Sequence, residues 1–338
     1  MLYVTTRNEL DTVPAGCALR ENRAKDGGFY VPFRLEPLPA DRIRELLNKP
    51  FGECVAEVLN QLLQCRLTAW DVDFSVGRYP VRLEKAGHRT FLAELWHNPQ
   101  WTYDRLVTNL SRTLCPENST SASWGKIAIR IAVLFGIFGQ LRREGIHKAD
   151  VCVLSGDFSA PISAWYAGRL GLPIGNIVCT CNENHVLWDL LCQGQLRTNS
   201  VSIPTTVPQA DIALPEELER LIFACGGREE TDRYRECCHL GGVYIPGEEL
   251  LARLRDGLYV SVVSSKRLER IVPGVYRSHG LLLSPATALT YAGLQDYRAK
   301  TGVSRHAVVL SEESPHCAVQ TLAPMLGIGE EELKQQLL

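Results

Sequence analysis

The sequence lacks the features that mark several common classes of protein. Its 338 residues carry 36 basic and 38 acidic side chains, a net charge of -2, so no positive surplus exists to hold nucleic acid or an anionic membrane. Hydrophobic residues make up 45%, which predicts a folded globular chain. Lysine is scarce. The eight lysines are Lys25, Lys49, Lys85, Lys126, Lys148, Lys266, Lys300 and Lys334.

The spacing of the cysteines, the opening residues and the length of the apolar runs argue against metal-binding, secreted and membrane-spanning proteins. The twelve cysteines include no C-x-x-C pair, so we expect buried thiols and no metal site. The opening MLYVTTRNEL has no basic segment followed by an apolar one, which favours a cytoplasmic protein without a signal peptide. The most apolar stretch, residues 127–141, contains Arg130 and is shorter than the ~20 residues of a membrane span. It predicts a buried core helix.

Apolar periodicity predicts two helices in the N-terminal part of the chain. We expect the first thirty-odd residues to be irregular, followed by helices over 39–47 and 52–63. Residues 79–84 and 90–96 are typical of a β-hairpin, with Ala86-Gly87 near the turn.

From residue 151 onward, short apolar runs alternate with helical patterns. Strands are predicted over 151–154, 177–180 and 307–310. Helices are predicted over 161–170, 214–224, 248–254 and 286–298, the last capped by Ser284. Such alternation predicts an α/β fold: a three-layer parallel sheet with helices on both faces.

Two loops follow predicted strands, and ligands in such folds bind beyond the carboxyl ends of strands. One is Ser155, Gly156, Asp157, Phe158, Ser159 and Ala160; the other is Ser311, Glu312, Glu313, Ser314 and Pro315. The first precedes a helix, where free N–H groups bind anions. However, it has a single glycine, and Asp157 adds negative charge. A simpler interpretation is that Asp157 or Ser159 caps the helix.

Other residues give no catalytic pattern. His97 follows a predicted strand, and Asp104 fits the first turn of a helix because of the helix dipole. The sequence contains no Ser/His/Asp order, metal-ligand spacing, phosphate-binding P-loop or G-x-G-x-x-G. The residues alone therefore predict an α/β protein of undefined function.

Several segments nevertheless match one family. Residues 171–175 read G-L-P-I-G and residues 182–187 read N-E-N-H-V-L, against G-L-P-I-G and N-E-N-D-V-L in threonine synthases. Further similar segments are 3–7, 26–32, 121–127, 219–223 and 284–288. The chain thus resembles threonine synthase, a fold-type-II pyridoxal-phosphate enzyme. The resemblance implies an N-terminal segment with helices, residues 1–75, and an α/β core that resembles the family's large domain, residues 76–338. It also implies pyridoxal phosphate as the family's cofactor.

The chain departs from the family at four places. Asp104 stands where the family has its Schiff-base lysine, and a carboxylate cannot form an imine. Compared with the family, the chain lacks the small domain, with the deletion falling near residues 115–120. The phosphate-cradling G-N-F-G-N has become Gly156-Asp157-Phe158-Ser159-Ala160, and Glu312 replaces a family threonine near the pyridine nitrogen. Residues 155–160 and Glu312 would then be a vestigial cofactor site.

These departures suggest a threonine synthase-like protein that has lost catalysis and serves a binding or regulatory role. No catalytic residue or metal ligand is then assigned, and we expect no covalently bound pyridoxal phosphate. The alternatives are an active lyase making threonine from O-phosphohomoserine and a small-molecule binder that uses the residual crevice. The sequence identifies no protein partner.

Overall fold

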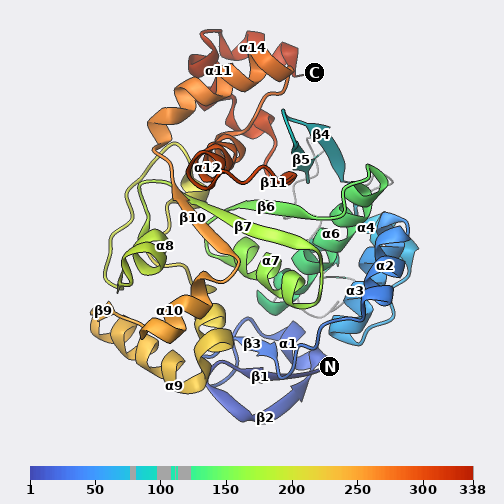
Figure 1. Ribbon diagram of the computed structural model, residues 1–338, viewed down its shortest axis with the longest axis vertical. Coiled ribbons are helices and arrows are strands. Elements are labelled where there is room, and N and C mark those ends of the chain that lie inside the picture. Colours follow the sequence, from blue (N-terminus) through green and yellow to red (C-terminus); the bar gives the residue numbers. More distant parts are fainter. Residues whose placement is uncertain (77–80, 97–107, 111, 113–122, 338) are drawn as a thin grey trace.

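A six-stranded sheet forms the middle layer of the molecule (Figure 1). The computed structural model describes residues 1–76, 81–96, 108–110, 112 and 123–337. The strand order is β10-β7-β6-β11-β5-β4, and all neighbours are parallel except β4 and β5. The strands are β4 (Arg82–Lys85), β5 (Thr90–Glu94), β6 (Ala149–Leu154), β7 (Ile174–Cys181), β10 (Leu258–Val262) and β11 (Ala307–Ser311).

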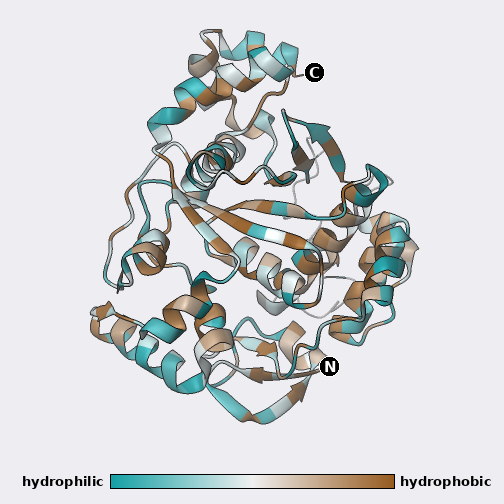
Figure 2. Ribbon diagram, in the orientation of Figure 1, coloured by the Kyte–Doolittle hydropathy of each residue, from teal (hydrophilic) through white to brown (hydrophobic). Residues whose placement is uncertain are grey.

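Helices cover both faces of this sheet because its central strands are apolar on both sides. In β6, Val151 and Val153 enter one hydrophobic core while Cys152 enters the other, as the two-residue period of a strand requires. Figure 2 shows β6 and β7 as largely hydrophobic ribbons. The three-layer α/β fold predicted from the sequence is therefore confirmed, with one antiparallel strand at the edge.

One core lies between the sheet and a group of helices that includes α6 (Ser123–Arg143) and α7 (Ser159–Arg169). Helices α2 (Ala40–Asn48) and α3 (Phe51–Leu63) pack on the outer side of α6, and α4 (Ala69–Val76) packs on α3. Residues 124–143 are long and apolar enough to cross a membrane, but 83% of that window is buried inside the fold. This helix behaves as the core helix that the sequence predicts.

The second core lies beneath α12 (Pro285–Thr301) and α11 (Leu268–His279) on the other face. Ser284 caps α12 as predicted, because its hydroxyl accepts a hydrogen bond from the Thr287 N–H. Two short helices, α13 (Val319–Leu326) and α14 (Glu330–Gln336), complete this end of the molecule.

The N-terminal residues correct one expectation, because they are not irregular. They form a three-stranded sheet, β2-β1-β3, from β1 (Leu2–Thr5), β2 (Asn8–Pro14) and β3 (Tyr30–Pro32), with α1 (Ala15–Arg20) between the last two. Strand β2 is largely exposed on both faces, so its sequence shows no alternation of apolar residues. Backbone pairing with β1, rather than burial, holds it in place.

A further group of elements packs beside the N-terminal sheet (Figure 1). Helix α9 (Leu218–Leu240) is longer than the helix expected over 214–224, and α10 (Glu248–Arg255) agrees with its prediction. The remaining elements are α8 (Val186–Trp188), β8 (Leu196–Arg197) and β9 (Val243–Tyr244). The division of the chain at residue 75 stays a prediction.

Candidate functional site

The predicted site loops meet at the carboxyl ends of β6 and β11, which are neighbours in the sheet. Together with α6 and α12 they enclose a pocket of about 260 Å³, here called the crevice. Of the predicted site residues, those in contact with the crevice are Ser155, Gly156, Asp157, Ser159, Ala160 and Glu312. Phe158 is missing from the lining, because its side chain is buried in the core.

The first loop turns tightly into α7. The Phe158 N–H donates to the Ser155 carbonyl at 2.8 Å, and Phe158 adopts a left-handed backbone with φ of 74°. This conformation is uncommon for a bulky residue and is held by the burial of the phenyl ring. The turn places the Asp157 side chain beside the first amide of the helix.

Asp157 acts as the anion at the start of α7. Its Oδ1 accepts a hydrogen bond from the Ser159 N–H at 2.9 Å. The sequence predicted Asp157 or Ser159 as the helix cap. Asp157 supplies the hydrogen-bond acceptor, although the N-cap position itself belongs to Phe158. An N–H group that would face an external anion is therefore already bound to a carboxylate of this chain.

The second loop contributes an ion pair that spans the crevice. The Arg130 guanidinium on α6 donates two hydrogen bonds to the Glu312 carboxylate, the one between Nη2 and Oε2 at 2.9 Å. The side chains are 13% and 33% exposed, so the pair is only partly screened by water. In the sequence, Arg130 is the single charged residue of the apolar run 127–141. Nothing in the sequence pattern links it to the predicted site loops.

Glu313 adds a third carboxyl group to the crevice lining. Burial raises the pKa of Glu313 above its usual range, and a hydrogen bond with Gln209 partly offsets this effect. With Asp157 and Glu312, the lining holds three carboxyl groups against one guanidinium, that of Arg130. The crevice is therefore acidic overall.

A chain of hydroxyl groups fixes the floor behind these acids. The Trp96 indole N–H donates to Ser311 Oγ at 2.9 Å, and Ser311 Oγ is 2.8 Å from Thr287 Oγ1. Thr287 Oγ1 lies 3.0 Å from Ser284 Oγ in turn. This chain joins the end of β11 to the start of α12, so it holds the second loop rigidly against the sheet.

The described lining does not fit the phosphate of pyridoxal phosphate. The α7 amide of Ser159 is occupied by Asp157, and Glu312 and Glu313 add further negative charge. No lysine is found among the described residues that line the crevice; Lys126 lies on the exposed side of α6. Asp104, His97 and the expected deletion near 115–120 lie outside the described residues.

Known proteins resemble the chain in sequence and in fold. Threonine synthase-like 1 of Homo sapiens is 24% identical over 51% of this chain and 24% of the relative. Threonine synthase of Pseudomonas aeruginosa is 24% identical over 54% of this chain and 39% of the relative. The chain thus spans about a quarter of the length of the human relative that it matches. No protein-family model matches it.

Among solved structures, pyridoxal-phosphate-bound threonine synthase from Brucella melitensis superposes with a TM-score of 0.85. The identity is 19%, and the superposition covers 97% of this chain and 92% of the other. The fold of this chain is therefore that of threonine synthase. The chain is thus similar to threonine synthases both in sequence and in fold.

Proposed function

We propose that this chain is a threonine synthase-like protein without catalytic activity, which binds or regulates a protein partner in the cytoplasm. The observation that carries the proposal is the Asp157 carboxylate on the Ser159 N–H, inside the loop that corresponds to the family's phosphate cradle. Asp104 at the position of the family's Schiff-base lysine supports it. The free thiols of the described cysteines suit a reducing compartment.

Electrostatics gives the proposal its physical basis. A phosphate charge at about 4 Å from the Asp157 carboxylate would meet a repulsion on the order of 4 kcal/mol per pair of unit charges at an effective dielectric constant of about 20. The Ser159 amide, already hydrogen-bonded to Asp157, would not offset that repulsion. A phosphate ester would have to displace Asp157 and then compete with the other crevice carboxylates.

The test uses the purified chain with pyridoxal phosphate, borohydride reduction and peptide mapping. Threonine synthase of Pseudomonas aeruginosa serves as the positive control. We expect no stoichiometric adduct at any single lysine and no threonine from O-phosphohomoserine. A stoichiometric adduct on one of the eight lysines would favour the active lyase instead.

A second experiment separates the loss of the lysine from the loss of the phosphate loop. Asp104→Lys alone should not restore threonine synthesis, because Asp157 still occupies the start of α7. The matched variant adds Asp157→Asn and Ser159→Gly, which bring the loop closer to the family sequence. Threonine synthesis by the single variant would contradict the proposal, since the remaining site would then be intact.

The acidity of the crevice favours one alternative function, the binding of a small cation or a hydroxyl-rich molecule. Asp157, Glu312 and Glu313 would face such a ligand. Binding would raise the melting temperature by mass action. Putrescine should then stabilise the chain more than inorganic phosphate does, and stabilisation by phosphate alone would rule this alternative out.

A further inference from the structure

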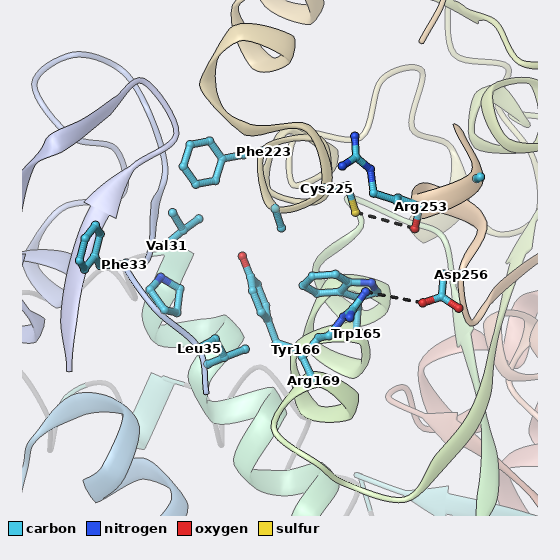
Figure 3. A pocket seen from close by; sticks show the side chains of 13 residues that line it. Val31, Phe33, Leu35, Trp165, Tyr166, Arg169, Phe223, Cys225, Arg253 and Asp256 are labelled. Carbon is cyan, nitrogen blue, oxygen red and sulfur yellow. Dashed lines mark hydrogen bonds and ion pairs between the residues drawn. The ribbon is translucent and has the colours of Figure 1, made fainter. Parts of the chain in front are cut away.

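A second and larger cavity lies away from the crevice, with a volume of about 730 Å³ (Figure 3). It opens to solvent and is bordered by β3 and the residues just after it, by α7, by α9 and by α10. Small-molecule pockets span roughly 300–1,000 Å³, so the cavity has a suitable size. We call it the aromatic cavity, after Phe33, Trp165, Tyr166 and Phe223 in its lining.

The aromatic walls are held in place before any ligand arrives. Trp165 and Tyr166 meet edge to face at 5.3 Å between ring centroids, and the buried Trp124 meets Tyr166 from behind at 5.7 Å. Figure 3 shows Phe223 across the cavity from these two rings. Rigid aromatic side chains offer a ring-shaped ligand contact area at little cost in conformational entropy.

The charged side chains of the cavity are two arginines and one aspartate. Arg169 is engaged, because it lies 3.6 Å from Asp256 and stacks over Trp165 at 4.8 Å. Arg253 projects from α10, and none of the carboxylates in the described part of the chain lies within ion-pair distance of its guanidinium. The aromatic cavity therefore carries a positive charge, that of Arg253, without an ion-pair partner in the described part of the chain, whereas the crevice is acidic.

The two sites sit at opposite ends of α7. Ser159 and Ala160 line the crevice, while Trp165 and Arg169 line the aromatic cavity. From Ala160 to Arg169 the helix rises roughly 13 Å at 1.5 Å per residue. A ligand in the aromatic cavity would therefore not contact the crevice acids, and the cavity can function whatever the crevice does.

We infer that the aromatic cavity binds a small planar anion, namely an aromatic ring carrying a carboxylate or a similar acidic group. The ring stacks among Trp165, Tyr166 and Phe223, and the acidic group receives hydrogen bonds from the Arg253 guanidinium. Arginine suits this role because its planar donors match a carboxylate in a bidentate manner.

Calorimetric titration of the full chain with naphthoate tests the inference, with naphthylmethanol as the neutral probe of the same ring. We expect saturable binding of naphthoate and binding of naphthylmethanol weaker by roughly tenfold or more. Arg253→Gln should reduce naphthoate affinity to about the level of the neutral probe. Arg277→Gln, an equal loss of charge at an exposed position on α11, should leave it unchanged.

A second variant tests whether naphthoate binds inside the aromatic cavity and not elsewhere on the chain. Ala252 is exposed on α10 and lines the cavity, so Ala252→Trp fills the space without disturbing the core. Naphthoate binding should disappear in this variant while the melting temperature is kept. The inference is overturned if naphthoate does not bind, if binding survives Ala252→Trp, or if the neutral probe binds equally well.

Discussion

At the scale of single residues, Glu94 shows how burial can make stability depend on pH. It ends β5, is 6% exposed, and its Oε2 has no hydrogen-bond partner among the described residues. Among the described residues, the nearest cation is Arg82, whose Nε lies 3.9 Å from Glu94 Oε2. Burial raises the pKa of Glu94 to about 7 from 4.5, an effect that Arg82 reduces and Glu84 increases.

The raised pKa of Glu94 makes the folded chain less stable at higher pH. The folded chain holds the Glu94 proton more tightly than the unfolded chain, so the free energy of unfolding falls as the pH rises from 4.5 to about 7. One pKa unit corresponds to about 1.4 kcal/mol, which gives a loss of roughly 3 kcal/mol across that range. Above it, the ionised carboxylate remains buried with poor compensation.

Glu94→Gln should therefore stabilise the chain at pH 8 by up to roughly 3 kcal/mol and have little effect near pH 4. Urea denaturation at several pH values measures the difference between the variant and the original chain. Glu332→Gln, at an exposed carboxylate on α14, should show no such pH dependence. Equal stabilisation by Glu94→Gln at all pH values would show that the carboxyl group is not titrating in this range.

At the scale of elements, α9 contains a kink that the sequence pattern did not predict. Gly227 has φ of 74° and ψ of -170° inside this helix, a conformation open to glycine and strongly disfavoured for other residues. The first part of α9 places Phe223 and Cys225 along the aromatic cavity. The kink lets the second part turn away toward β9.

Gly227→Ala should lower the free energy of unfolding by about 1–3 kcal/mol, because of the backbone conformation and not because of crowding. The nearest atom to an added Cβ would be 4.0 Å away. Gly274→Ala in α11 is the control: nothing lies within 4 Å and its backbone is ordinary, so it should be neutral or stabilise by up to about 1 kcal/mol. Thermal unfolding compares them, and equal effects would contradict this account.

Comparison of the predicted with the observed helices and strands shows which elements the sequence can reveal. The unit β6–α7–β7 was predictable because two apolar strands flank a helix that begins beside a polar loop and ends near Gly171. The helix expected over 214–224 ended just before the kink at Gly227, and the helical stretch that continues to Leu240 was not expected. Strand β2 was missed because pairing with β1 leaves no mark in its polar sequence.

The crevice and the aromatic cavity also differ in how well the sequence predicts them. The crevice could be placed from the sequence because both of its loops follow predicted strands, and Asp157 was recognised as a capping acid. Arg130 was not linked to Glu312, because 182 residues separate them. The aromatic cavity depends on the packing of four segments, near residues 33, 166, 224 and 253, and no local pattern connects those segments.

At the scale of the whole molecule, a buried arginine joins the N-terminal sheet to the core. Arg220 on α9 is fully buried and forms an ion pair with Glu217 and a hydrogen bond to the Tyr30 carbonyl on β3. Its guanidinium also lies 4.8 Å from the Phe29 ring centroid and 5.6 Å from that of Trp124 on α6. One side chain thus contacts three separate parts of the fold.

Arg220→Met should destabilise the chain by about 3–5 kcal/mol, because it leaves the Glu217 carboxylate buried without its partner. The matched control is Arg233→Met, which breaks an ion pair with Glu230 on the same helix. The Arg233 side chain is 56% exposed, so its loss should cost less than about 1 kcal/mol. Urea denaturation measures both. Adding Glu217→Gln to Arg220→Met should recover part of the loss, since no charge then remains buried. If it recovers nothing, the contacts with Tyr30, Phe29 and Trp124 outweigh the ion pair in joining the sheet to the core.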